Sequence, residues 1–78
     1  MQQRFDPVSF GERLHQARTR KGLTMVQVQD IVYVSQGTIS RYEHGISYPS
    51  IERVYELAKL YGCSMDRLCG LKEVDDDE

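Results

Sequence analysis

Residues that start helices alternate regularly with residues that end them along this sequence, and this alternation constrains the fold more than any other feature. A small hydroxyl side chain, which can cap the first turn of a helix, precedes each of five segments with helically spaced apolar residues. These hydroxyl residues are Ser9, Thr24, Ser35, Ser50 and Ser64. Glycines, which readily adopt the left-handed conformation that ends a helix, follow three of the segments, at Gly22, Gly45 and Gly62. The pattern predicts an all-α fold with five helices.

The first predicted helix follows Ser9, which is placed to form a capping box with Glu12. Its apolar residues Phe10, Leu14 and Ala17 recur at helical spacing. We expect the other helices at about residues 25–32, 36–44, 51–61 and 65–71.

The last two predicted helices differ in how much apolar surface they carry. The fourth has a stripe wide enough to face a core, made of Ile51, Val54, Leu57, Ala58 and Tyr61. The fifth carries Met65, Leu68 and Leu71 on little more than two turns. It is too short to be stable alone, so it must pack against other helices.

A chain of 78 residues with 40% hydrophobic residues has room for one small domain with a single core. The β-branched run at residues 31–34, IVYV, is brief and has no pairing partner, so we expect no sheet. The predicted architecture is a compact five-helix bundle over residues 9–72. A flexible N-terminal arm at residues 1–8 would precede it, and an acidic, disordered tail at residues 73–78 would follow it.

The acidic tail masks a mildly basic body. The formal net charge is −2, but five of the twelve acidic residues lie in the last six positions, EVDDDE. Residues 1–72 carry ten basic and seven acidic side chains, a net charge of +3. This charge is compatible with nucleic acid but is far from that of a protein that binds by charge alone.

Several classes of protein are disfavoured by the sequence. No apolar run approaches the ~18 residues of a membrane span, and the N-terminus lacks the profile of a signal peptide, so we expect a cytoplasmic protein without a membrane partner. Cys63 and Cys69 fit neither a redox motif nor a zinc site, so we expect small buried hydrophobes and no metal or cofactor. No catalytic motif is recognisable, so we do not expect an enzyme.

The segment VSQGTISRYEHG, residues 34–45, predicts a helix with two different faces. With Ser35 as its N-cap, Ile39 and Tyr42 share one side, and Val34 can pack on Ile39 as a hydrophobic staple. The opposite face is polar and consists of Gln36, Gly37, Ser40, Arg41 and His44. This face is either an ordinary solvated surface or one suited to the major groove of DNA, where glutamine, arginine and serine can bind base edges.

Gly37 is unusual inside a helix, where glycine costs about 1 kcal/mol relative to alanine. Its missing side chain would let a base edge or a thymine methyl group approach the helix closely. Under the alternative interpretation it is only a weak point of a solvated helix. The third segment alone leaves both interpretations open.

The neighbouring sequence favours the DNA interpretation. The apolar residues Val28, Val32, Val34, Ile39 and Tyr42 match the spacing of a helix-turn-helix. Three successive blocks, RLHQARTRKGLT, VSQGTISRYEHG and YPSIERVYELAKLYGCSMDRL, resemble the Cro/C1-type (XRE) helix-turn-helix family over about residues 10–71. The resemblance implies a lambda-repressor-like DNA-binding domain whose third helix reads bases.

The resemblance also implies roles for single residues. The positions that match base or backbone contacts of the family are Gln36, Gly37, Ser40 and Arg41. Those expected near phosphates are Thr24, Ser35, Thr38 and His44. Arg18 and Glu43 match a pair that joins the first helix to the third by a partly buried salt bridge.

Three positions depart from the family pattern. Met25 replaces a glutamine that often braces against phosphate. Gln29 replaces an alanine that lets the two helices of the motif pack closely. Tyr33 replaces a turn glycine, so this tyrosine must accept or avoid a left-handed backbone conformation. These changes could alter the docking angle or mark a loss of DNA binding.

The leading hypothesis is a sequence-specific DNA-binding transcriptional regulator, a repressor, that binds double-stranded DNA as a homodimer. The fifth helix offers candidate dimer residues Met65, Leu68, Cys69 and Leu71, although these side chains could instead complete the core of the monomer. The alternative hypothesis is a protein-interaction module, such as an antitoxin or adaptor, that uses the same bundle to bind another protein.

Overall fold

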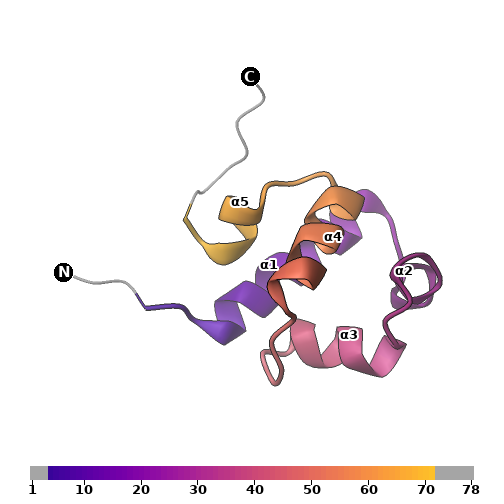
Figure 1. Ribbon diagram of the computed structural model, residues 1–78, viewed down its shortest axis with the longest axis horizontal. Helices are drawn as coiled ribbons and strands as arrows, with labels where there is room; N and C mark the ends of the chain where they lie inside the picture. The colour runs from indigo at the N-terminus through magenta and orange to yellow at the C-terminus, as the bar shows by residue number, and fades with distance from the viewer. Residues whose placement is uncertain (1–3, 72–78) are drawn as a thin grey trace.

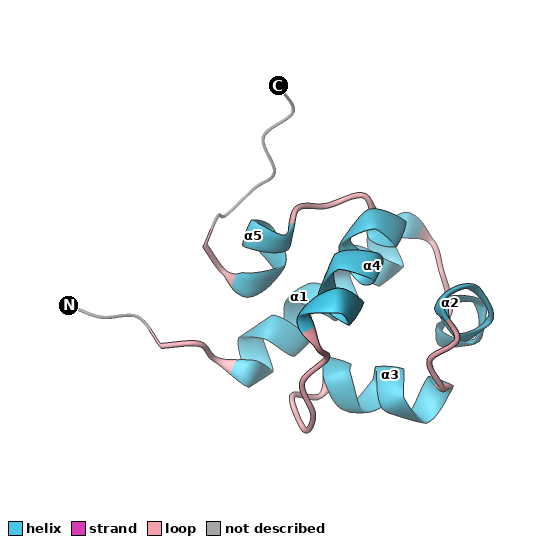
Figure 2. Cartoon of the chain, in the orientation of Figure 1, coloured by secondary structure: helices cyan, strands magenta, loops and turns pink. Residues whose placement is uncertain are grey.

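The structure, a computed structural model, describes residues 4–71 and consists of five α-helices joined by short loops (Figure 1). The helices are α1 (Pro7–Lys21), α2 (Met25–Val32), α3 (Gln36–Glu43), α4 (Ile51–Tyr61) and α5 (Met65–Cys69). Figure 2 shows helices and loops but no strand in this part of the chain, which confirms the predicted all-α class. The predicted tail, residues 73–78, lies outside the described residues.

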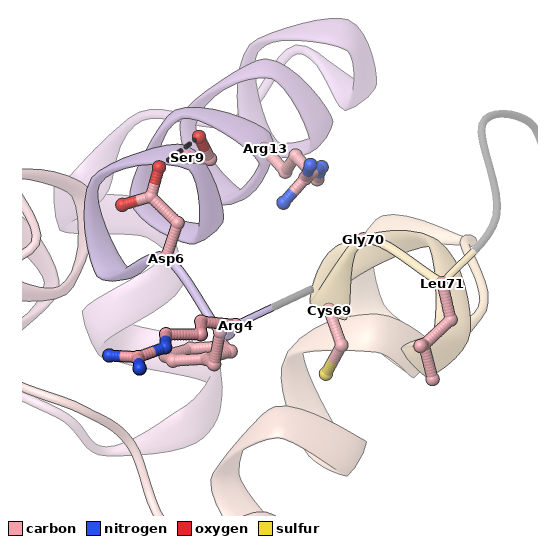
Figure 3. Close-up of a pocket in the computed structure, with 8 residues that line it drawn as sticks. Arg4, Asp6, Ser9, Arg13, Cys69, Gly70 and Leu71 are labelled. Carbon is pink, nitrogen blue, oxygen red and sulfur yellow. Dashed lines mark hydrogen bonds between the residues drawn. The ribbon is translucent and has the colours of Figure 1, made fainter. Parts of the chain in front are cut away.

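The start of α1 differs from the sequence-based prediction. Asp6, not Ser9, is the N-cap: its carboxylate accepts hydrogen bonds from the Val8 N–H at 3.1 Å and from the Ser9 hydroxyl at 2.7 Å (Figure 3). Pro7 occupies the first turn, where its missing N–H costs no hydrogen bond. The capping box predicted for Ser9 is therefore wrong. Pro7 and Val8, assigned to the N-terminal arm, belong to α1.

The four other predicted caps are confirmed. The side chains of Thr24, Ser35, Ser50 and Ser64 each accept a hydrogen bond from a backbone N–H in the first turn of the helix that follows. Gly22 and Gly62 end α1 and α4 in the left-handed conformation. Gly70 does the same for α5, so this helix ends at Cys69, earlier than predicted.

The core lies around α1, which packs against α3, α4 and α5, while α2 packs on α3 (Figure 1). Its buried hydrophobic side chains are Phe10, Leu14, Ala17, Val28, Val34, Ile39, Tyr42, Val54, Leu57, Ala58, Tyr61 and Leu68. One predicted member of the α4 stripe is missing, because Ile51 is 70% exposed. It is the first residue of α4, and helical spacing cannot show whether a neighbouring helix reaches that end.

Helices α1 and α3 touch at Gly11, a contact that the sequence did not reveal. A Cβ atom at this buried glycine would lie 2.4 Å from the Glu43 carbonyl oxygen and 2.7 Å from that of Tyr42. Only glycine therefore lets α1 pack directly on the C-terminal end of α3. Across residues 4–71, no helix combines the length and apolar character that spanning a membrane requires.

Candidate nucleic-acid interface

Helices α2 and α3 are joined by a tight turn at residues 33–35. Tyr33 ends α2 in the left-handed conformation, with φ 59° and ψ 37°, and its N–H donates to the Gln29 carbonyl at 2.9 Å. The tyrosine therefore accepts the strained backbone that the family usually gives to glycine, at a cost of roughly 1–2 kcal/mol. Its side chain is 86% exposed and does not contribute to the core.

The two faces of α3 differ as predicted. Ile39 and Tyr42 are buried on the inner face, and Val34, just before the Ser35 cap, is buried in the same cluster. On the outer face Gln36, Gly37 and Arg41 are exposed within the helix, Ser40 is half-buried, and His44 follows as the exposed C-cap. In Figure 1, α3 runs along one edge of the bundle beside α2, on the opposite side from α5. The polar face is therefore held from behind by apolar packing.

A buried ion pair fixes the C-terminal end of α3 to α1. The Arg18 guanidinium donates from Nε to Glu43 Oε2 at 2.7 Å and from Nη2 to Glu43 Oε1 at 3.0 Å. Its Nη1 also donates to the Leu23 carbonyl at 2.8 Å. The hydrogen bonds from Glu43 hold the pKa of Arg18 above its usual value, although burial opposes this shift. The pair that the resemblance implied thus joins three segments of chain.

His15 extends this ion pair toward solvent. Its Nδ1 lies 3.0 Å from Glu43 Oε1 and 3.1 Å from Arg18 Nη2. The imidazole is half-exposed, whereas the side chain of Glu43 is 3% exposed. Sequence reasoning missed His15, although it lies three residues before Arg18 on the same face of α1.

The hydroxyls at the start of α3 connect to Arg41. Ser35 Oγ accepts from the Thr38 N–H at 3.1 Å and donates to Thr38 Oγ1 at 2.8 Å. Arg41 Nη2 donates to the same Thr38 Oγ1 at 3.2 Å. The guanidinium therefore lies back along the outer face toward the N-terminus of α3, beside Gly37.

The fold itself does not require a glycine at position 37. A Cβ atom there would meet only Arg41 Nη1, at 3.9 Å, which is an ordinary contact distance. The Gly37 N–H has no hydrogen-bond partner among the described residues and lies on an exposed stretch of backbone. If the glycine at position 37 has a role, that role must therefore lie in contacts outside the helix.

His44 and Thr24 flank this face at the two ends of the motif. His44 Nδ1 lies 2.8 Å from the Ser40 carbonyl, so Nδ1 carries a proton and the neutral ring presents Nε2 as an acceptor. Thr24 Oγ1 accepts from the Gln27 N–H at 3.1 Å, and Gln27 Oε1 accepts from the Thr24 N–H at 2.8 Å. This capping box at α2 was readable in the sequence as Thr24 followed by Gln27, but it was missed. Met25, next to the cap, is half-buried and packs on the core.

For Leu68, one of the candidate dimer residues in the fifth helix, the alternative holds that it completes the core of the monomer. Its side chain is 1% exposed and fills the monomer core, because α5 is too short to hold its place without it. Met65 and Cys69 are half-buried against the core, and Leu71 is 74% exposed. Only the exposed parts of this region are open to a second chain.

The two cysteines are free thiols and half-buried, less enclosed than predicted. Burial raises the pKa of Cys69, with a smaller contribution from the Asp66 carboxylate, so the thiol stays protonated at neutral pH. Cys69 and Leu71 line a shallow hollow with Arg4, which precedes α1, and Arg13, in the middle of α1 (Figure 3). Within residues 4–71, no group of three potential metal ligands is gathered.

Comparison with known proteins places this geometry in a family. The sequence profile described as Helix-turn-helix matches residues 14–68. Among curated proteins, the chain is 36% identical over 67 residues to the HTH-type transcriptional activator BcrR of Enterococcus faecalis, covering 86% of this chain and 33% of BcrR. It is 30% identical over 69 residues to the cryptic phage CTXphi transcriptional repressor RstR of Vibrio cholerae, covering 88% of this chain and 62% of RstR. The chain thus spans only part of these relatives.

Solved structures agree with the family assignment. The restriction-modification controller protein C.AhdI from Aeromonas hydrophila superposes with a TM-score of 0.74 at 27% identity, covering 81% of this chain and 96% of C.AhdI. The DNA-binding domain of BldD superposes with a TM-score of 0.71 at 26% identity, covering 81% of this chain and 92% of that domain. By sequence and by structure, this chain belongs to the Cro/C1-type helix-turn-helix family.

Proposed function

We propose that this chain binds double-stranded DNA in a sequence-specific manner and regulates transcription, as a repressor. The observation that carries the proposal is the division of α3 into a buried side and a polar side. Ile39, Tyr42 and Glu43 are buried, whereas Gln36, Gly37 and Arg41 are exposed on one continuous surface. The relatives BcrR and RstR, named as an activator and a repressor of transcription, support a regulatory role.

The polar face has the chemistry that major-groove recognition needs. Gln36 can bind adenine through two hydrogen bonds, and Arg41 can bind guanine or a phosphate. Ser40 can donate to several base edges. Gly37 leaves the backbone bare between them, so a base edge can approach the helix there. A Cβ atom at this position would have Arg41 Nη1, at 3.9 Å, as its nearest neighbour from the rest of the fold.

Hydroxyl and imidazole groups around this face supply the proposed phosphate contacts. Ser35 and Thr24 accept cap bonds through lone pairs, and the Thr24 hydroxyl proton stays available to a phosphate oxygen. Thr38 Oγ1 accepts from both Ser35 and Arg41, so its own proton is also available. With Nδ1 of His44 donating to the Ser40 carbonyl, Nε2 is the ring nitrogen left for the proposed phosphate contact.

We propose that two chains bind together, because one short helix reads few base pairs and a two-fold dimer places two such helices about 34 Å apart. The proposed dimer surface is the outer side of α4 and α5, where Ile51 and Tyr55 are exposed beside half-buried Met65. Glu52 and Glu56 border this apolar patch and would repel phosphate, so it suits a protein partner better than DNA. Leu71 lies exposed just beyond α5.

Selection of bound duplexes from a random library, using the full chain at two salt concentrations, tests the proposed function. We expect an enriched motif with two-fold symmetry that survives the higher salt, because base contacts depend less on counterion release than phosphate contacts do. Arg41→Ala and Gln36→Ala should each weaken binding to the enriched duplex about 5- to 100-fold, the range of a lost base contact. Arg20→Ala, which removes an exposed positive charge from the last turn of α1, is the matched control and should bind nearly as well as the wild type.

Recovery of no motif, or equal binding by Arg41→Ala and the wild type, would contradict base reading by α3. The dimer is tested separately by sedimentation of the wild type and of Tyr55→Glu. The proposal predicts a dimer that this substitution dissociates.

A cytoplasmic location, where a DNA-binding protein meets its target, forms part of the same proposal.

A further inference from the structure

We propose that Gln29 is a positioning residue for DNA recognition: it ties together both ends of the turn between α2 and α3 and so fixes the direction in which Gln36 projects. Gln29 is half-buried in α2 and faces the start of α3. The inference rests on the proposed function, because it assigns a new residue to the same DNA-reading surface.

Two hydrogen bonds of Gln29 bracket the turn. Its side-chain Oε1 accepts from the Gln36 N–H at 2.7 Å, across seven positions of sequence. Its backbone carbonyl accepts from the Tyr33 N–H at 2.9 Å, inside the left-handed turn residue. One residue of α2 therefore holds the chain where it leaves α2 and again where it enters α3.

The first turn of α3 is held by apolar packing of Ile39, but it has few other hydrogen bonds to neighbouring helices. The Thr38 N–H is bound by Ser35 Oγ at 3.1 Å and the Ile39 N–H by the Ser35 carbonyl at 3.0 Å, both from within the local chain. Gly37, the residue after Gln36, has no side chain that could pack on a neighbouring helix. Within residues 4–71, the bond to Gln29 is thus the hydrogen bond that connects the first α3 amide to another helix, whereas free amides at this position are often left to solvent.

Loss of the bond between Gln29 and Gln36 would loosen the orientation of Gln36 more than it would destabilise the fold. Gln36 is exposed, so water can replace Gln29 as the partner of its N–H, at little change in folding free energy. The strained Tyr33 turn would then keep its backbone bond to Gln29, the bond from Arg53 Nη1 to the Val32 carbonyl at 3.2 Å and the buried Val34 side chain, but would lose its direct link to the first amide of α3. A base-reading side chain that starts from a looser turn samples more directions. Discrimination between bases should therefore decrease while the stability of the fold stays nearly unchanged.

Two substitutions at position 29 test the acceptor oxygen of Gln29 separately from the size of its side chain. Gln29→Met keeps the length and removes the acceptor, whereas Gln29→Glu keeps an acceptor oxygen and adds a negative charge. We expect Gln29→Met to lower discrimination at the base position that Gln36→Ala also affects, by about 3- to 10-fold, the effect of one hydrogen bond. Its urea midpoint and its binding to a random duplex should stay near those of the wild type.

The Glu variant should weaken binding to every duplex alike, through repulsion of phosphate, while it keeps the base preference. Adding Gln29→Met to Gln36→Ala should reduce discrimination no further, because both changes act through one side chain. Amide exchange of Gln36, followed by NMR, should quicken in Gln29→Met and not in Gln29→Glu.

The outcomes distinguish the role of Gln29 from the proposed DNA binding itself. If the wild type discriminates between bases and Gln29→Met does so equally well, the role of Gln29 is overturned and the proposed function stands. The role is also overturned if Gln29→Glu loses discrimination as fully as Gln29→Met. If the wild type itself shows no discrimination, the proposed function fails, and the role of Gln29 fails with it.

Discussion

Helices α3 and α5 are both short and both begin at a serine N-cap, yet they use their side chains differently. Helix α3 is anchored from one side by Ile39, Tyr42 and the Arg18–Glu43 pair, so its opposite face is free. Helix α5 has five residues and places Leu68 in the core, which leaves little of it to present outward. A short helix can therefore serve as a reading surface only when neighbouring elements supply its stability.

The largest expected effect concerns the ion pair behind α3. Glu43→Ala leaves the buried Arg18 guanidinium without its carboxylate, which should lower the free energy of unfolding by about 3–5 kcal/mol. Urea denaturation measures the loss, with Glu43→Gln as the milder variant if the alanine variant does not fold. The matched control is Glu56→Ala, which breaks the half-exposed Arg53–Glu56 pair and should cost at most about 1 kcal/mol. Equal losses for both pairs would show that α3 is not anchored by Glu43.

Leu68→Ala tests the other half of the comparison. The substitution removes a side chain that is 1% exposed and should cost about 2–5 kcal/mol through lost burial and a residual cavity. Leu71→Ala, at a side chain that is 74% exposed, should change stability by less than about 0.5 kcal/mol. If the two variants unfold at the same urea concentration, α5 does not close the core as described.

Gly11→Ala tests the close packing of α1 on α3. The added Cβ would lie 2.4 Å from the Glu43 carbonyl oxygen, so the helices must separate, at a cost of about 1–3 kcal/mol or more. Thermal unfolding measures the change in stability. Unchanged stability would mean that the two helices can shift apart freely, which the rigid seating of α3 forbids.

The smallest predicted effect separates folding from reading at Gly37. Alanine is the better helix former by up to about 1 kcal/mol, and the fold has room for its Cβ, so Gly37→Ala should stabilise the chain slightly. The same methyl group would obstruct a base edge, so binding to the selected duplex should weaken. Differential scanning calorimetry and a binding isotherm on the same sample would show opposite changes. A gain in both quantities would leave Gly37 without a role in DNA binding.

Most of the fold followed from local patterns, because caps and apolar spacing are properties of short segments. The bounds of α2 and α4 and the caps at Thr24, Ser35, Ser50 and Ser64 were predicted in this way. At α1 two cap signals compete, and Asp6 followed by Pro7 wins over Ser9 with Glu12. Whether Leu68 faces the core or a second chain stayed open in the sequence, because periodicity gives the face of a helix but not which neighbour covers that face.

The site was only partly readable from the sequence. The polar face of α3 follows from helical spacing, since Gln36, Gly37 and Arg41 fall on one side. The Gln29–Gln36 bond and the Gly11 contact could not be predicted, because each depends on the distance between two helices. Sequence spacing orders residues around one helix, whereas tertiary distances decide which of them touch.

The central claim is that the outer face of α3 meets the duplex. The most direct measurement is the change in backbone amide NMR shifts when the selected duplex is added to the full chain. We expect the largest changes at Gln36, Gly37, Ser40 and Arg41, with smaller ones at Thr24. Changes concentrated instead at Ile51, Tyr55 and Met65, with α3 unaffected, would contradict it.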